Sequence, residues 1–345
     1  MSNSKRNVNI DLIRVIAMLL VIAIHTRLRP MADSALAQAI LMAVLFFCNS
    51  AFFMISGGLN IKKTFSSAED IRQFWLKKAI TILFPLLFMI IFLYIWDIID
   101  GDAAFSFKTL YEYIMGNGPY GHLWYMYYLI GFILSTPILS KAFNTMDRKA
   151  LNMIFVACIA WNVLSIFLTK DIGVNFAYTG WIMSGWATVY FAGYYIDRNI
   201  NDGNKKTLYI LGIAGFAVTV LGSWIIPEHY YNKNDLSPAY IAFTMALYVF
   251  LLREIKIKNK YFAGVIKFIA KYSFIIYLVH WNVLYKITPH FINQSAGCTA
   301  QFFEMIIITF VLCLAVAFVL ETVILTPCKM AMLKLLNRRT GESHG

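Results

Sequence analysis

Three histidines and one arginine stand in segments of the chain that are otherwise strongly apolar. Arg14 and His25 lie in the first apolar segment, His122 opens a later one, and His280 lies near the end of another. An ionisable side chain within a membrane helix costs about 2.5–3.5 kcal/mol on insertion scales, so each one suggests a function. Histidine titrates near neutral pH and commonly serves as a general base. The set therefore suggests proton-transfer chemistry within a membrane.

The spacing of Arg14 and His25 predicts that they share one face of a helix. They are eleven residues apart, which is three turns plus about 20°, with a separation of about 16 Å along the axis. The alternative is that Arg14 pairs with Asp11 at i, i+3, and that His25 is an interfacial histidine with its hydrogen bonds satisfied. A histidine trio can also bind metal, but no acidic or cysteine ligand is spaced beside these three. We therefore expect no metal.

The elements that must position these residues are membrane helices. Of 345 residues, 60% are hydrophobic and 14% are charged, whereas a soluble domain carries about 25% charged residues. The apolar runs are long and do not alternate, which favours helices over the short strands of a barrel. We expect an all-α, polytopic membrane protein of about ten transmembrane helices forming one domain over residues 1–345. The expected spans are 9–27, 35–58, 77–97, 122–140, 150–169, 179–197, 207–227, 238–254, 264–286 and 301–327.

The basic residues predict the orientation of these helices. Most of the 30 lysines and arginines fall in segments on the same side as the N-terminus, and basic segments face the cytoplasm. Both termini are therefore expected in the cytoplasm, and the net charge of +12 needs no nucleic-acid partner. The opposite side holds Arg27, Arg29, Lys108, Lys170, Lys233 and Lys286.

The N-terminal segment also resembles a signal peptide. Lys5 and Arg6 precede an apolar run, and residues 35–37 read Ala-Leu-Ala, as at a cleavage site. However, Asp11 and Arg14 do not suit the apolar region of a signal peptide. We interpret the segment as the first membrane helix.

A second polar group lies on the cytoplasmic side. The second helix ends in the run from Phe52 to Gly58, which contains Ser56. Its small residues can allow close helix packing or can free backbone N–H groups for an anion. Five basic residues follow, and they suggest phosphate recognition, although basic loops are also ordinary on this side. They are Lys62, Lys63, Arg72, Lys77 and Lys78.

These motifs, in this order, resemble those of the acyltransferase-3 family of integral-membrane acyltransferases. The family's first-helix arginine and histidine resemble Arg14 and His25. Its basic stretch before a proline resembles Lys77 and Lys78, with lysine where arginine is common, which weakens the expectation of a bidentate phosphate contact. Three further motifs resemble Phe52 to Gly57, His122-Leu123-Trp124, and Tyr277 with His280.

The resemblance implies transfer of an acyl group, usually acetyl, from cytoplasmic acyl-CoA to a hydroxyl of an envelope polysaccharide or lipid-linked sugar at the cell inner membrane. Acetyl-CoA would be a donor substrate and not a bound cofactor. Some members carry an appended soluble domain, and we expect none here.

Given that activity, we expect His25 to be the general base, by direct transfer or as an acyl carrier, with Arg14 beside the donor. The substrate-binding residues are expected to be Ser56, Lys77, Lys78, His122, Trp124, Tyr277 and His280.

Two other classes of function stay open at this point. Ten helices with polar residues at two depths can line a path in a transporter or a flippase, but matched helix-breaking pairs are missing from the two halves. A non-catalytic scaffold leaves Arg14, His25 and His280 unexplained. The acceptor sugar, the acyl length and the oligomeric state do not follow from the sequence.

Overall fold

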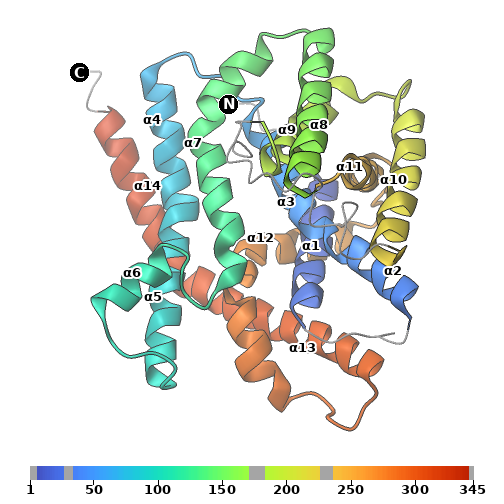
Figure 1. The fold of residues 1–345 in the computed structure, drawn as a ribbon. Helices are drawn as coiled ribbons and strands as arrows, with labels where there is room; N and C mark the ends of the chain where they lie inside the picture. The colour runs from blue at the N-terminus through green and yellow to red at the C-terminus, as the bar shows by residue number, and fades with distance from the viewer. Residues whose placement is uncertain (1–5, 27–33, 171–182, 226–235, 342–345) are drawn as a thin grey trace. The chain divides into compact units, whose positions relative to one another are not determined.

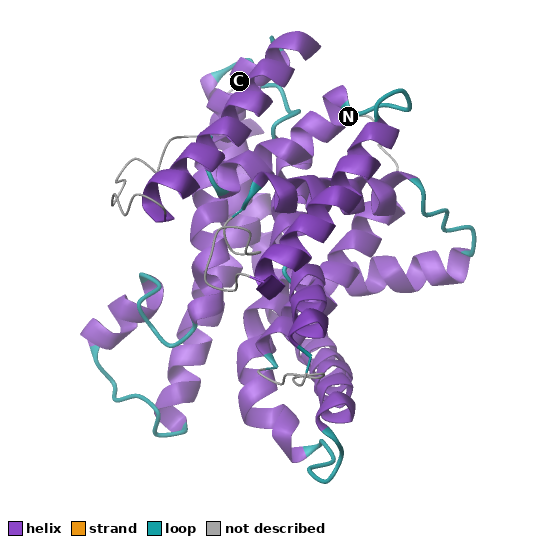
Figure 2. Cartoon of the chain, turned by 45° about the vertical axis from the view of Figure 1, so that its right-hand side comes forward, coloured by secondary structure: helices purple, strands orange, loops and turns teal. Residues whose placement is uncertain are grey.

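The computed structural model describes residues 6–26, 34–170, 183–225 and 236–341. These residues form helices joined by loops, with no strand among them (Figure 2), which confirms the all-α prediction. Part of the expected span 179–197 lies outside the described residues, and its described part belongs to α9 (Trp186–Asn199). A shorter apolar helix covers Pro238–Arg253. Eight described helices are long and apolar enough to cross a membrane, namely Val8–His25, Ala35–Asn60, Ala68–Ile99, Gly121–Asn144, Arg148–Leu168, Lys205–Ile225, Lys260–His290 and Cys298–Leu336.

The chain folds into two compact units, and each unit is built from segments far apart in the sequence. Unit 1 comprises residues 1–64, 135–270 and 295–302. Unit 2 comprises residues 65–134, 271–294 and 303–345.

In unit 1, α1 (Val8–His25) packs against its neighbours along its whole length. Its partners are α2 (Ala35–Leu45), α3 (Phe47–Asn60) and α11 (Pro238–Arg253) (Figure 1). The Asn7 side chain caps the helix by accepting from the backbone N–H of Asn9, which satisfies one donor of the first turn. Every residue of α1 is buried or half-buried. The first helix is therefore partly covered by other helices of the unit along its length.

The remaining helices of unit 1 pack in pairs. α8 (Arg148–Lys170) lies against α9, and α10 (Lys205–Ile225) lies against both α11 and α2. The unit also contains the last part of α7 (Trp124–Asn144) and the first part of α12 (Lys260–Asn282).

Glycines bring α3 and α9 into backbone contact. A Cβ atom on Gly57 would lie 1.7 Å from the carbonyl oxygen of Tyr190, and one on Gly193 would lie 1.9 Å from that of Met54. Only glycine fits at both positions. Small residues are the usual means of bringing membrane helices close, because dispersion contacts replace the hydrophobic effect there. Of the two roles expected for the small residues of the second helix, the structure assigns close packing to Gly57.

Unit 2 is built from long helices with wider π-helical turns inside them. α4 (Ala68–Lys78) continues through η1 (Ala79–Leu83) into α5 (Phe84–Ile99), followed by α6 (Phe107–Ile114). After the short η2 (Gly121–Leu123), α7 begins. The last part of α12 leads into η5 (Val283–Ile287) and η6 (Thr288–His290). The final helices are α13 (Cys298–Val319), which belongs to unit 2 from Phe303 on, η7 (Leu320–Leu325) and α14 (Thr326–Gly341).

Two of these helices extend beyond the predicted spans 77–97 and 301–327. α4 starts earlier because Ser67 and Asp70 form a capping box, which satisfies two orphan backbone donors at its first turn. Near the C-terminal end of the sequence, α14 continues to Gly341. Hydrogen bonding within a helix does not stop where its apolar residues end, so hydropathy underestimates such helices.

The contact between α3 and α9 yields a stability test. Gly193→Ala should lower the apparent unfolding midpoint in detergent, because overpacking of this kind costs about 1–3 kcal/mol. Gly264→Ala is the matched control, since this exposed glycine of α12 has nothing within 4 Å of its would-be Cβ. Equal midpoints for the two variants would contradict the close packing.

Candidate active site

A buried carboxylate organises the N-terminal half of α1. Asp11 is 0% exposed and accepts from Arg6 Nε at 2.5 Å and from Arg14 Nη1 at 2.9 Å. Arg14 therefore pairs with Asp11, as the alternative interpretation of the sequence predicted. Asn9 fixes the same end of the helix, because its Nδ2 donates to three backbone carbonyls at the end of α11 and just after it, those of Leu251, Leu252 and Ile255.

A cavity of ≈ 430 Å³ opens beside this ion pair within unit 1. Its charged lining residues are Arg6, Asp11, Arg14, Lys62 and Asp197, and Lys62 Nζ lies 3.8 Å from a carboxylate oxygen of Asp197. Three cations thus face two carboxylates. The volume falls within the range of about 300–1,000 Å³ that is usual for small-molecule sites.

Arg14 retains hydrogen-bonding capacity toward this cavity. Among the described residues it donates one N–H, to Asp11, and its side chain is 28% exposed. A guanidinium has five N–H donors in a planar fork that matches phosphate and carboxylate geometry. The cavity therefore has the charge and the donors to bind an anionic ligand.

His25 is the last residue of α1 and is half-buried. The helix is continuous from Val8, so Arg14 and His25 share one helix, as predicted. No residue of α1 is fully exposed, so the stripe that carries both side chains is at least partly covered by protein.

In unit 2, two buried histidines come together from distant parts of the sequence. The rings of His122, in η2, and His280, near the end of α12, have centroids 4.7 Å apart. The Trp281 ring stacks on His122 with centroids 5.3 Å apart and an interplanar angle of 13°. Among the described residues no group of three or more His, Cys, Asp or Glu is arranged to hold a metal ion.

Tyr277 connects the two histidines. Its hydroxyl donates to the carbonyl oxygen of His122, and its own carbonyl oxygen lies 2.6 Å from His280 Nδ1. A carbonyl only accepts, so Nδ1 of His280 carries the proton. In the neutral ring, Nε2 then holds the lone pair, which is the arrangement of an oriented base.

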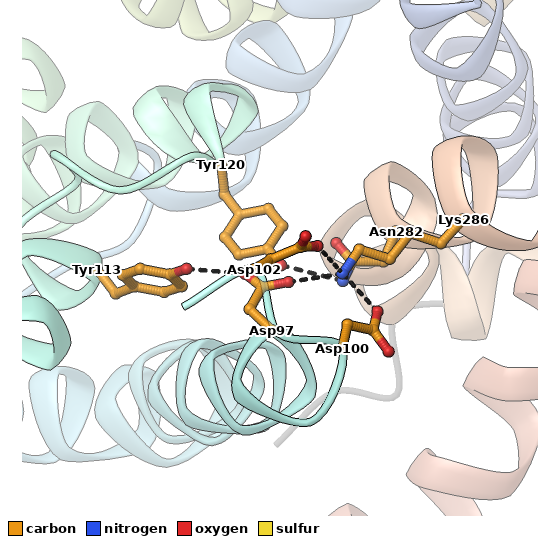
Figure 3. A network of polar contacts seen from close by, with 7 residues as sticks. All are labelled: Asp97, Asp100, Asp102, Tyr113, Tyr120, Asn282 and Lys286. Carbon is orange, nitrogen blue, oxygen red and sulfur yellow. Dashed lines mark hydrogen bonds and ion pairs between the residues drawn. The ribbon is translucent and has the colours of Figure 1, made fainter. Parts of the chain in front are cut away.

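Unit 2 contains a second polar network (Figure 3). It reaches the histidines through Tyr120, whose ring centroid lies 6.1 Å from that of His122. Lys286 Nζ lies 2.8 Å from Asp97, 2.7 Å from Asp100 and 2.9 Å from Asp102. The other oxygen of Asp97 accepts from two tyrosine hydroxyls, those of Tyr113 and Tyr120.

The network shifts the titration of its members outside the membrane helices. The hydrogen bond from Lys286 lowers the pKa of the Asp100 carboxyl. Burial, and then the carboxylate of Asp97, raise the pKa of the Tyr113 and Tyr120 phenols well above the ordinary value of 10. Both tyrosines therefore stay protonated at neutral pH, and their hydroxyls donate hydrogen bonds to Asp97.

A model of the acyltransferase-3 family, described as an acyltransferase domain, matches residues 7–322. The chain belongs to the acyltransferase-3 family. It is accordingly an acyltransferase, and the matched region includes residues of both units. Searches of curated proteins and of solved structures gave no significant match.

The structure distributes the other predicted site residues of this acyltransferase over the two units. Ser56, on α3 in unit 1, accepts from Asn60 Nδ2 at 3.1 Å. Trp124 begins α7 in unit 2, with its ring 5.7 Å from that of Tyr128. Lys77 and Lys78 end α4 in unit 2.

The two lysines have different surroundings. Lys77 is exposed, whereas Lys78 is half-buried with Nζ 5.6 Å from the centroid of the Phe74 ring. The cavity of unit 1 is lined by Arg6, Arg14 and Lys62, and Arg6 is a cavity residue that the sequence analysis did not predict.

Lys286 was also missed, as was Asn282, whose Nδ2 donates to the Tyr120 hydroxyl at 3.0 Å. A signal for Lys286 existed. It is one of few basic residues on the expected outer side, and Asp97, Asp100 and Asp102 fall on that same side. An excess of acids around a rare cation can suggest an ion pair. No sequence pattern indicated which of the acids the lysine would meet.

The bond from Tyr277 to His122 provides a second test. Tyr277→Phe should lower the stability of the acyltransferase by about 1 kcal/mol, the usual net value of one hydrogen bond, seen as a lower unfolding midpoint in detergent. Tyr261→Phe removes a hydroxyl from a tyrosine that is 75% exposed and should leave the midpoint unchanged. A Tyr277→Phe midpoint equal to that of the wild type would show that this hydrogen bond contributes nothing.

Proposed function

We propose that this acyltransferase transfers an acetyl group from acetyl-CoA to a hydroxyl of an envelope polysaccharide or lipid-linked sugar in the inner membrane. The observation that carries the proposal is the cation-lined cavity at one end of α1, the same continuous helix that ends in His25. Membership of the acyltransferase-3 family supports the reaction class. The donor, the acceptor and the roles of the residues are our inferences.

The cavity suits the donor because coenzyme A is anionic. Phosphate groups match the N–H fork of Arg14 and the ammonium of Lys62. The positive-inside distribution puts this end of α1 at the cytoplasmic face, where acyl-CoA is available. A pantetheine arm extended along α1 would cover the approximately 16 Å between Arg14 and His25.

His25 supplies the base that an alcohol needs. In the proposed step, the acceptor hydroxyl gives its proton to an imidazole nitrogen of His25 as its oxygen attacks the thioester carbonyl carbon. The tetrahedral intermediate then collapses, the carbon–sulfur bond breaks, and the departing thiolate takes the proton from the imidazolium. The products are the O-acyl sugar and free coenzyme A. No acyl-enzyme is required.

We assign acceptor binding to the histidine cluster of unit 2. His122 and Trp281 form a stacked pair, and flat ring faces of this kind suit the apolar face of a sugar. His280 and Tyr277 add polar groups that can hold hydroxyls or stabilise a developing oxyanion. Trp124 extends the aromatic surface at the start of α7.

The assignment of His25 predicts a specific loss of activity. Membranes containing the His25→Ala variant and supplied with radiolabelled acetyl-CoA should transfer label to envelope glycans about 10²–10⁴-fold more slowly than wild type, the usual contribution of a general base. His290→Ala is the control, because His290 is exposed in η6. Equal labelling by His25→Ala and wild type would refute the general-base role. If the wild type transfers no label to any glycan, the acetyl-transfer proposal fails and a transport function gains support.

The cavity assignment predicts a defect in donor binding. Arg14→Ala should raise KM for acetyl-CoA by about tenfold or more, because a hydrogen bond to a charged group contributes about 1.5–3 kcal/mol. The acceptor KM should stay unchanged. Lys149→Ala, which removes an exposed cation at the start of α8, should have no effect. An unchanged donor KM in Arg14→Ala would place the donor elsewhere.

A further inference from the structure

Lys286 is surrounded by three carboxylates that come from one short stretch of chain. Asp97 lies near the end of α5, and Asp100 and Asp102 lie in the turn that follows it. Gly101 at φ +81° allows this turn, and the backbone N–H of Asp102 returns to the carbonyl oxygen of Asp97 at 2.8 Å. The turn therefore aims all three carboxylates at one ammonium.

Asp97 differs from the other two acids in being buried. It is 3% exposed, whereas the side chains of Asp100 and Asp102 are 37% and 62% exposed. An ion pair in solvent contributes little, but a buried charge depends strongly on its partner. The ion pair between Lys286 and Asp97 therefore contributes more to the structure than the pairs of Lys286 with Asp100 and Asp102.

Asp97 is linked by hydrogen bonds to the segments that carry His122 and His280. The hydroxyl of Tyr120 donates to Asp97 Oδ2 at 2.7 Å and accepts from Asn282 Nδ2 at 3.0 Å (Figure 3). Tyr120 precedes His122 by two residues, and Asn282 follows His280 by two residues. The Tyr120 and His122 rings have centroids 6.1 Å apart. The network thus holds both segments that carry the histidines.

We propose that Lys286 and Asp97 are positioning residues for the acceptor, which rests on the proposed function of the histidine cluster. Their ion pair fixes the Tyr120 hydroxyl, and Tyr120 with Asn282 fixes the spacing of His122 and His280. Neither charged residue needs to touch the acceptor. A displacement of about 1 Å in groups that orient a substrate can cost about a hundredfold in rate.

The decisive variant is Lys286→Met, which keeps the length of the side chain and removes its charge. The carboxylate of Asp97 would then be buried with only two tyrosine donors. The acceptor KM should rise about ten- to hundredfold, while the donor KM stays unchanged. In the purified protein, backbone amides of residues 113–123 should exchange with deuterium faster than in the wild type.

Two further variants separate positioning from general damage. Asp97→Asn combined with Lys286→Met leaves no unpaired buried charge, so its acceptor KM should lie closer to wild type than that of Lys286→Met alone. Lys108→Met removes a cation that is 86% exposed on α6 in the same unit. It should change neither the acceptor KM nor the exchange of residues 113–123.

The outcomes distinguish this proposal from the proposed function. If the wild type transfers label and Lys286→Met has a normal acceptor KM, only the positioning role is refuted. Faster exchange with an unchanged acceptor KM also refutes it, because the network would then be purely structural. A wild type that transfers no acetyl group refutes the proposed function, and the positioning role falls with it.

Discussion

The pairing of a buried aspartate with two arginines is the interaction on which unit 1 depends. Asp11 is completely buried on a helix long and apolar enough to cross a membrane, where an isolated carboxylate would be strongly destabilising. Arg6 and Arg14 neutralise it from two sides. Because Asp11 uses only part of the Arg14 guanidinium, the same contact that makes the carboxylate tolerable also presents a cation to the neighbouring cavity. Stability and the proposed anion recognition are thus coupled in one side chain.

In unit 2, as in unit 1, a cation neutralises a buried carboxylate. There, Lys286 neutralises the buried Asp97, and the remaining carboxylate oxygen orders tyrosine hydroxyls. In unit 1 the cations line a cavity. In unit 2 the ion pair of Lys286 and Asp97 is linked through hydrogen bonds to the segments that carry His122 and His280. In both cases a buried acid near the end of a membrane helix holds the groups to which we assign substrate binding.

Hydropathy and residue spacing predicted the helical class, most of the spans, and the shared helix of Arg14 and His25. These features are local, because they depend on the period of one helix or on the length of one apolar run. The partners of Asp97 could not be predicted, since Lys286 is far away in the sequence and any of several acids could have met it. The extent of α4 was also missed, because its first turn is polar and is held by a capping box. Contacts across the chain depend on which helices become neighbours, and a single sequence does not specify that.

The π-helical turn η5 has a consequence for comparing related chains. Such a turn is an α-helical turn widened by one extra residue, and here it begins three residues after His280 and includes Lys286. A homologue with an uninterrupted α-helix would need its lysine one position earlier to point in the same direction. An alignment anchored on Tyr277 and His280 would then pair Lys286 with a neighbour of the equivalent lysine. An apparent loss of this cation in a relative could therefore be a shift in register, and only the helix geometry would reveal that the charge has been retained.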